Sequence, residues 1–237
     1  YIPLRHGEGY GLNAAAVQKL ARAHVRLLIT VDNGVSAFDE IALCRNLHID
    51  VIITDHHSIG AALPECCAVV SAKRAESRYE NRELCGAGVA LKLAQALLPE
   101  EDHRFDLTLA AVATVADVVP VIGENRAIIA QGVRYVTEVP GLRALLAAAG
   151  WKAEQAVSEQ TIAFLLAPRL NASGRMGDAM RGVELLLCAD EASAQPLAQG
   201  LDADNTARRN AEKGIAEQAL AQVDLSRREL LAAHADW

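Results

Sequence analysis

The sequence predicts an α/β fold in which helices flank a parallel sheet, followed by a helical region and a connecting helix. Two short apolar runs, Val25–Val31 and Val51–Thr54, each end at polar turn residues, as buried strands do. A helix over Ser36–Leu47, capped by Ser36, separates them. This strand–helix–strand order predicts parallel strands joined by a right-handed crossover. The composition agrees, because only 4% of the residues are aromatic and Ala and Leu dominate the apolar set.

The rest of the chain predicts one further strand, over Cys67–Ser71, and a series of helices. These helices are expected over Ala14–Ala23, Leu84–Leu98, Phe105–Ala116, Glu124–Thr137 and Leu142–Ala149, and one or two long helices are expected over Asp190–Gln222. A Gly-rich, Arg-bearing loop is expected over Pro168–Gly177. The change of composition near Gly177 predicts one boundary, between segments 1–177 and 178–237.

The bulk properties narrow the class of protein. A net charge of −7 argues against a generally basic coat for nucleic acid, although it is compatible with a local basic groove. The five Cys show no spacing typical of a disulfide framework or a zinc site, so we expect free thiols. There is no signal peptide and no apolar run of about 18 residues, which predicts a cytoplasmic protein without membrane contact. Because the chain begins at Tyr1, within a motif-like stretch, we expect it to be a fragment.

Polar residues follow the two predicted strands at the point where each strand ends. Asp32 follows the first strand, and Asp55, His56 and His57 follow the second. Ligands of open parallel sheets bind at the carboxyl ends of the strands, and neighbouring strands lie about 4.8 Å apart, so these side chains should share one crevice. Asp117 follows a third apolar segment and is expected to close it. Carboxylates held this closely repel one another, and a divalent cation removes that repulsion.

Each of these residues also has a simpler explanation. Asp32 taken alone is typical of a turn, because Asn33 and Gly34 follow it. His56 and His57 alone would be a solvated pair at a strand end, and Asp117 alone would be a helix-end residue. The ordered set favours a metal site, and its mixture of imidazole and carboxylate suits Mn²⁺, or Mg²⁺ where oxygens predominate.

Six ordered stretches resemble the DHH phosphoesterase superfamily, and within it the RecJ-type single-stranded-DNA-specific exonucleases. They are Tyr1-Ile2-Pro3 with Glu8–Asn13, Ile29–Ser36, Ile52–His57, Leu84–Ala90, Thr114–Pro120 and Ala167–Arg175. The resemblance covers nearly the whole chain. Two departures are Leu4, where the family pattern has a polar residue, and Val70–Lys73, which lacks an expected Asn-Pro pair.

The resemblance implies a role for each strand-end residue. Asp32 resembles the carboxylate that bridges two metal ions, His56 a metal ligand and Asp117 the last ligand of the second metal. His57 resembles the residue that contacts the scissile phosphate, and Asp55 a partner that orients a histidine. The family's aspartate-rich motif would precede the first residue, so we expect an incomplete ligand set in this chain.

The resemblance also implies an activity and an organisation. The activity is hydrolysis of phosphodiester bonds in single-stranded DNA, as a 5′→3′ exonuclease of DNA repair and recombination, with two divalent cations, Mn²⁺ or Mg²⁺. The implied partners are single-stranded DNA, a single-strand-binding protein and a helicase. Segment 1–177 would be a DHH catalytic domain lacking its N-terminal strand, and 178–237 a helical connector towards an absent nucleic-acid-binding domain. Activity is expected of the parent protein rather than of the fragment.

The expected loop carries four residues that suit a nucleic-acid backbone: Arg169, Asn171, Ser173 and Arg175. Guanidinium groups and exposed backbone amides bind phosphate well. The alternative is a structural loop whose Arg side chains pair with acidic groups, and the resemblance favours nucleic-acid contact.

Two other functions remain open from the sequence. One is a DHH phosphodiesterase of cyclic dinucleotides or short oligonucleotides, which would use the same metal crevice. The other is an inactive replication scaffold, which the presence of all five strand-end and helix-end residues disfavours.

Overall fold

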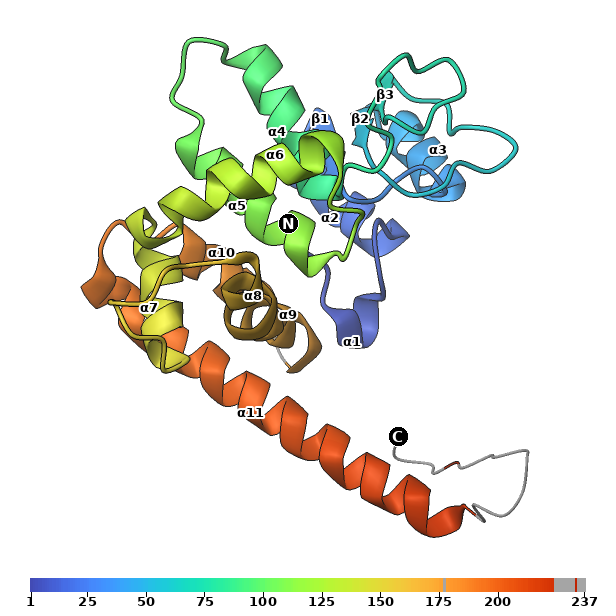
Figure 1. Ribbon diagram of the computed structural model, residues 1–237. Coiled ribbons are helices and arrows are strands. Elements are labelled where there is room, and N and C mark those ends of the chain that lie inside the picture. Colours follow the sequence, from blue (N-terminus) through green and yellow to red (C-terminus); the bar gives the residue numbers. More distant parts are fainter. Residues whose placement is uncertain (177, 224–232, 234–237) are drawn as a thin grey trace.

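The computed structural model describes residues 1–176, 178–223 and 233. A three-stranded parallel sheet lies on one side of it, at the upper right of Figure 1. The strands β1 (Leu27–Val31), β2 (Asp50–Thr54) and β3 (Ala68–Val70) lie in that order. In the β1–β2 register Val31 lies opposite Thr54, so both strands end at the same edge. The predicted parallel pair and the predicted third strand are confirmed.

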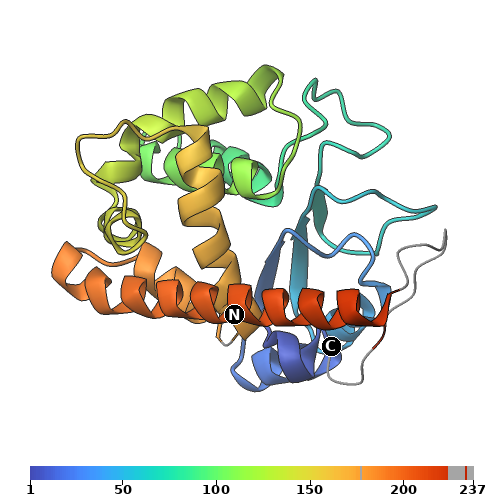
Figure 2. The ribbon, with the colours of Figure 1, turned by 60° about the horizontal axis from the view of Figure 1, so that its bottom comes forward.

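Helices α2 (Ala14–Arg22) and α3 (Phe38–Asn46) pack on one face of this sheet (Figure 2). Their shared core is made of buried apolar side chains, namely Val17, Val35, Ile41, Cys44, Ile49, Val51 and Ile53. The cap predicted for α2 is confirmed, because Asn13 Oδ1 accepts a hydrogen bond of 2.8 Å from the Ala16 N–H.

The cap predicted for α3 is wrong. Ala37 occupies the cap position and makes no side-chain cap hydrogen bond. The Ala37 N–H donates to the Gly34 carbonyl at 3.1 Å, which places Ser36 inside a turn rather than at the start of the helix. The tight connection out of β1 therefore overrides the preference of Ser for the cap.

Helix α4 (Gly86–Leu97) lies against β1 and β2 and connects the sheet to the helical part of the molecule. It packs on α5 (Arg104–Ala116), which in turn packs on α6 (Gly123–Gly132). Buried residues from these three helices form a second core, together with Val70 of β3. Since α5 ends at the cap residue Asp117, the helix end faces the sheet edge where β1 and β2 stop.

A third core holds the remaining helices together. The elements concerned are η1 (a 3₁₀ helix, Val133–Glu138), α7 (Pro140–Ala148), α8 (Glu159–Thr161), η2 (a π-helical turn, Ile162–Leu166), α9 (Ala167–Met176) and α10 (Met180–Leu186). The side chains of Leu142, Leu145, Leu146 and Leu166 in this core are fully buried.

The loop predicted over Pro168–Gly177 is wrong for the part that the structure describes. Ala167–Met176 forms α9, and Gly177 lies outside the described residues. Pro168 follows helical residues without a break, and the π-helical turn Ile162–Leu166 directly before it is the kind of irregularity that accommodates a missing N–H within a helix. Burial of Ala172 against the neighbouring helices outweighs the weak helix propensity of the Gly and Ser residues that suggested a loop.

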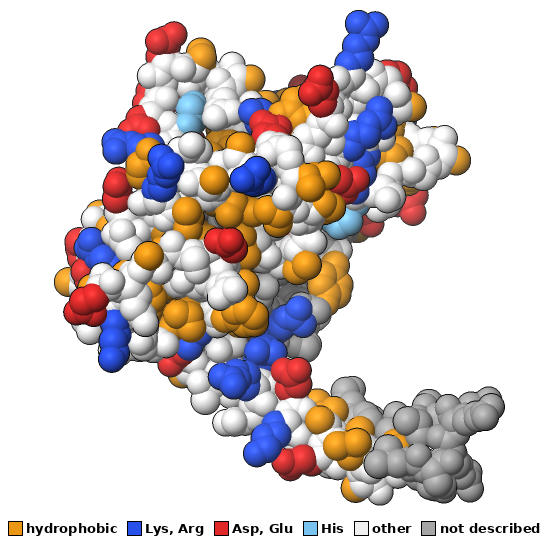
Figure 3. Space-filling model, viewed as in Figure 1, with side chains coloured by type: hydrophobic (Ala, Val, Ile, Leu, Met, Phe, Trp, Pro, Cys, Tyr) orange, Lys and Arg blue, Asp and Glu red, His pale blue; other side chains and the backbone are white. Residues whose placement is uncertain are grey.

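Helix α11 (Glu191–Gln222) confirms the long C-terminal helix and carries the chain away from the body (Figure 1). Asp190 caps it, with Oδ1 accepting a hydrogen bond of 2.8 Å from the Ser193 N–H. Its first half contributes Ala194, Ala198 and Leu201 to the third core. Its second half is mostly exposed and carries charges of both signs (Figure 3), including the pairs Arg208–Glu212 and Lys213–Glu217.

The α/β fold class, with a flanked parallel sheet followed by helices and a connecting helix, is confirmed. The third core contains residues from both sides of position 177. The domain boundary placed there stays a prediction. Among the described residues, none of the helices has both the length and the apolar composition that a bilayer span requires.

Candidate metal centre

The turn after β1 holds Asp32 in an unusual backbone conformation. Its φ angle is +65°, in the left-handed region that non-glycine residues seldom adopt. Two hydrogen bonds stabilise the turn, from Thr30 Oγ1 to the Asn33 carbonyl (2.7 Å) and from Asn33 Nδ2 to the Val31 carbonyl (2.9 Å). Asp32 can therefore be both a turn residue and a candidate metal ligand, because the turn directs its side chain away from the strand.

Helix α4 approaches Asp32 so closely that only glycine fits at its first position. A Cβ atom on Gly86 would lie 2.5 Å from both Cβ and Oδ1 of Asp32. No carbon atom tolerates such a distance, so the start of α4 acts as a wall that limits where the carboxylate can point.

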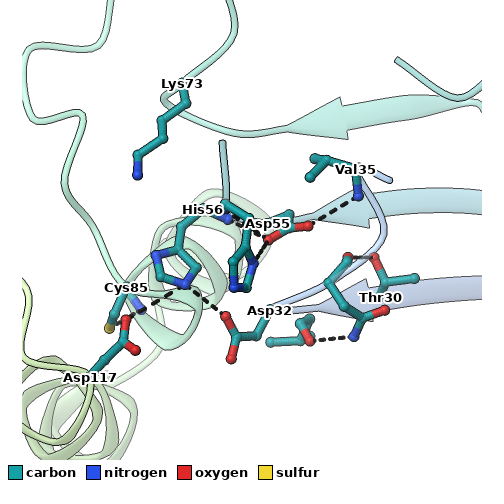
Figure 4. Close-up of polar contacts among 12 residues, drawn as sticks. Thr30, Asp32, Val35, Asp55, His56, Lys73, Cys85 and Asp117 are labelled. Atoms are coloured by element: carbon teal, nitrogen blue, oxygen red, sulfur yellow. Dashed lines mark hydrogen bonds and ion pairs between the residues drawn. The ribbon is translucent and has the colours of Figure 1, made fainter. Parts of the chain in front are cut away.

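His56 lies between two carboxylates that come from different parts of the fold (Figure 4). Its Nε2 atom is 2.9 Å from Asp32 Oδ1 and 3.6 Å from Asp117 Oδ2. The His56 side chain is only 13% exposed, whereas both carboxylates are open to solvent on one side. The sheet edge and the end of α5 thus supply one group of three ligand-type side chains.

Asp55 is buried and serves as a hydrogen-bond acceptor for the turn after β2. Its Oδ1 accepts from the backbone N–H of His56 (2.7 Å) and of His57 (3.1 Å), and Oδ2 accepts from the Val35 N–H (3.1 Å). Oδ1 also lies 2.7 Å from His57 Nδ1, which donates in the tautomer that this contact requires. That tautomer leaves the other ring nitrogen, Nε2, with a free lone pair.

These environments shift the pKa values of Asp55 and Asp32 in opposite directions. Burial of Asp55 would raise its pKa, but the hydrogen bonds from Val35, His57 and His56 hold the pKa below its usual value. Desolvation raises the pKa of Asp32, the neighbouring carboxylates add to this, and His56 and His57 oppose it. Asp55 is therefore a fixed negative charge, while Asp32 lies where a positive charge would be favourable.

The donor set fits a divalent cation. One ligand atom from each of Asp32, His56 and His57 lies within 4.8 Å of the others. Carboxylate oxygen and imidazole nitrogen are ligands that Mn²⁺ accepts. The wall formed by Gly86 leaves the Asp32 carboxylate facing these groups, and Asp117 adds a further oxygen on the other side of His56.

The group opens into a cleft of about 1000 Å³ between the sheet edge and the helices. Asp32, His57 and Asp117 line one end. The N-terminal segment around α1 (Arg5–Glu8) contributes Tyr10, and the opposite wall is formed by α9 and α10.

The four residues predicted to contact nucleic acid do not act as one group. Asn171, Ser173 and Arg175 line the cleft, although Ser173 is buried and its Oγ donates to the Leu170 carbonyl at 2.7 Å. Arg169 is committed elsewhere, because its Nε donates to Asp202 Oδ1 at 2.7 Å and its side chain is only 11% exposed. Arg169 therefore fits the structural alternative, in which an Arg side chain pairs with an acidic group. Of the four residues, only Asn171 and Arg175 are exposed at the cleft.

Sequence reasoning missed the contribution of Gly86 and of the two threonines. Thr54 Oγ1 donates to the Thr30 carbonyl at 2.7 Å, which joins the ends of β1 and β2 just before the site. The run Gly86-Ala87-Gly88 at a helix start was the one available signal, since glycine there indicates a close approach of another group.

Comparison with known proteins identifies the family. Residues 1–117 match the model of the DHH family, N-terminal domain. The chain belongs to the DHH family. The resemblance inferred from the sequence motifs is confirmed, since the DHH match includes every strand-end residue discussed above together with Asp117.

The chain is also similar to curated single-stranded-DNA-specific exonucleases named RecJ. It is 40% identical over 242 residues to the one from Bacillus subtilis, covering all of this chain and 30% of that protein. It is 36% identical over 236 residues to the one from Escherichia coli, covering 92% of this chain and 41% of that protein. The chain therefore spans less than half the length of these relatives.

Solved structures agree in fold. A crystal structure of exonuclease RecJ bound to manganese matches with a TM-score of 0.85 and 34% identity, over 94% of this chain and 57% of that one. RecJ from Thermus thermophilus in complex with Mn²⁺ matches with a TM-score of 0.78 and 31% identity, over 91% of this chain and 33% of that one.

Proposed function

We propose that this chain is the metal-binding part of a DHH-family exonuclease that hydrolyses phosphodiester bonds in single-stranded DNA. The observation that carries the proposal is the position of His56 Nε2, between Asp32 Oδ1 (2.9 Å) and Asp117 Oδ2 (3.6 Å), at the end of an open cleft. The support from relatives is that RecJ structures matching over more than 90% of the chain contain Mn²⁺.

The proposed cofactors are two divalent cations, Mn²⁺ or Mg²⁺, which when bound activate water and neutralise the phosphate. Asp32 would bridge the two sites, and His56 and Asp117 would each complete one of them. Asp55 would hold His57 in the tautomer whose Nε2 faces the cleft, so that this ring can contact the scissile phosphate.

The proposed substrate lies along the cleft with its backbone near Asn171 and Arg175. Both are exposed on the wall opposite the N-terminal segment, and a guanidinium group there would attract phosphate. Degradation from the 5′ end, a role in DNA repair and recombination, a cytoplasmic location and association with a single-strand-binding protein or a helicase belong to the same proposal. Segment 178–223 would then lead, through α11, towards a further nucleic-acid-binding domain.

The comparisons favour neither alternative function. The curated relatives described above are named as single-stranded-DNA exonucleases rather than as phosphodiesterases of small nucleotides or as scaffolds. A substrate-length series separates the first alternative, since a phosphodiesterase of small nucleotides would favour dinucleotides over long single strands.

The direct test is Asp32→Ala in the full-length protein that contains this chain. We expect loss of Mn²⁺-stimulated hydrolysis of single-stranded DNA in a domain that stays folded, because the Asp32 side chain is largely exposed. The unfolding temperature should fall only slightly, since Ala is strained in the left-handed conformation of this position. Asp39→Ala, an exposed acidic change in the first turn of α3, is the matched control and should retain full activity. Retained activity in the Asp32 variant would remove the proposed role of this site.

A further inference from the structure

We propose that Asn125 is a positioning residue that sets the distance between the two segments carrying Asp32 and Asp117. The proposal rests on the function proposed above, because it assigns Asn125 a role in cation binding. Asn125 lies on α6, touches neither carboxylate and acts through two backbone carbonyls.

Asn125 is completely buried, and its side-chain amide is fully used. Its Nδ2 donates to the Glu83 carbonyl at 2.6 Å and to the Pro120 carbonyl at 2.9 Å. Its Oδ1 accepts from Asn81 Nδ2 at 2.9 Å. A buried amide with three partners is costly to disturb, because each lost partner leaves a polar group unsatisfied.

The Pro120 carbonyl belongs to the segment that leaves Asp117. Val118, next to Asp117, has a φ angle of +57°, a strained conformation for a β-branched residue, and it is 86% exposed. Its own side chain therefore does little to hold it there, and such strain persists only where neighbouring groups fix the backbone. On the helix side the Val118 N–H donates to the Val115 carbonyl at 3.3 Å. On the other side the Asn125 amide and the Ile122 N–H both donate to the Pro120 carbonyl.

The Glu83 carbonyl belongs to the segment that leads into α4. Three residues later stands Gly86, whose α-carbon forms the wall against Asp32. Between them, Cys85 Sγ lies 3.4 Å from Thr114 Oγ1 of α5, so this segment is also held against the helix that ends at Asp117. One amide group thus joins the backbone behind Asp32 to the backbone beyond Asp117.

The surrounding contacts provide a natural comparison. Tyr79 Oη donates to Glu124 Oε2 at 2.6 Å, which joins the same loop to the same helix without reaching the Pro120 or Glu83 carbonyl. If any bond between this loop and α6 were sufficient, Tyr79 and Asn125 would be equivalent. If the two carbonyls matter, only Asn125 affects the carboxylates.

The test measures Mn²⁺ affinity by calorimetry in the full-length protein, with no DNA present. Asn125→Asp preserves size but replaces the donor by an acceptor, and we expect about tenfold weaker Mn²⁺ binding, the lower end of what loss of a group supporting metal ligands costs. Asn81→Ala removes one hydrogen-bond partner of Asn125 from a partly exposed position, so this variant should stay folded. It should weaken Mn²⁺ binding by a smaller factor than Asn125→Asp does. The Mn²⁺ electron paramagnetic resonance signal should change in both.

Two controls make the result decisive. Tyr79→Phe should leave Mn²⁺ affinity unchanged, and Leu146→Ala, a core change far from this network, should lower the unfolding temperature without changing Mn²⁺ affinity. Unchanged affinity in Asn125→Asp, or in Asn81→Ala if the former does not fold, overturns the role of Asn125. Absence of Mn²⁺ binding by the wild-type protein would instead reject the proposed function itself.

Discussion

The sheet edge and helix α9 both contain closely spaced polar residues, but the fold uses the two groups differently. At the sheet edge, Asp32 and His56 come from separate strands and lie 2.9 Å apart. On α9, Arg169 and Arg175 come from one helix, yet Arg169 pairs with α11 and Arg175 lines the cleft. Residues distant in sequence meet at the sheet, and residues close in sequence diverge on the helix.

The difference follows from the periodicity of each element. Parallel neighbours end side by side, so residues that follow them are brought together whatever their separation in sequence. In a helix each residue turns by about 100°, so positions two apart point to nearly opposite sides. The Arg169 and Ser173 side chains are therefore largely buried, although Ser173 still borders the cleft, and Asn171 and Arg175 are exposed.

The largest predicted effect is a loss of Mn²⁺ affinity, and it is expected from a change at Gly86, the residue that forms the wall against Asp32. Gly86→Ala should force the start of α4 and the Asp32 side chain apart and move the carboxylate away from His56, because the new Cβ would lie 2.5 Å from Asp32 Cβ and Oδ1. We expect Mn²⁺ affinity to fall about 10- to 100-fold, measured by calorimetry. Gly214→Ala, on α11 with open space around it, is the control and should change stability alone. Normal Mn²⁺ binding by the Gly86 variant would mean that the wall does not position the carboxylate.

A stability effect is expected on the protein-facing side of α9. Arg169→Ala should lower the free energy of unfolding by about 2 kcal/mol, because it leaves the half-buried Asp202 without its partner. Urea unfolding measures this loss, and DNA affinity at equal folded concentration should stay the same. Weaker DNA binding without a loss of stability would instead assign Arg169 to the cleft.

The buried carboxylate at the sheet edge predicts a pH dependence. The pKa of Asp55 is lowered in the folded state, so its stabilising effect is complete well above the unfolded value of about 3.9 and is lost as the pH falls through the folded value. Asp55→Asn should cost about 1–3 kcal/mol of unfolding free energy at pH 7 in chelator. This difference should shrink as the pH falls below about 4. A difference that persists unchanged in acid would exclude the charge as its source.

The smallest effect is expected on the cleft-facing side of α9. Arg175→Ala should raise the concentration of single-stranded DNA needed for half-maximal cleavage about three- to tenfold, with kcat and unfolding temperature nearly unchanged. The shift should diminish at high salt, because the contact is electrostatic. An unchanged concentration would return Arg175 to a structural role.

The same periodicity explains which features could be predicted from the sequence. The apolar runs before Asp32 and Asp55 predicted the parallel pair, and the strand-end positions of these residues followed from it. α9 was mistaken for a loop because its Gly and Ser residues are poor helix formers, and packing against the neighbouring helices, α11 among them, favours the helix. The left-handed φ of Asp32 and the three partners of Asn125 depend on contacts between distant segments, which one sequence does not reveal.

The most direct measurement is the anomalous scattering of Mn²⁺ in crystals of the full-length protein. The account predicts manganese at the Asp32 carboxylate, with one peak within coordination distance of the His56 Nε2 and one within coordination distance of the Asp117 carboxylate, and loss of this density in Asp32→Ala. Manganese peaks that lie away from the Asp32 carboxylate, or that persist unchanged in the variant, would contradict it.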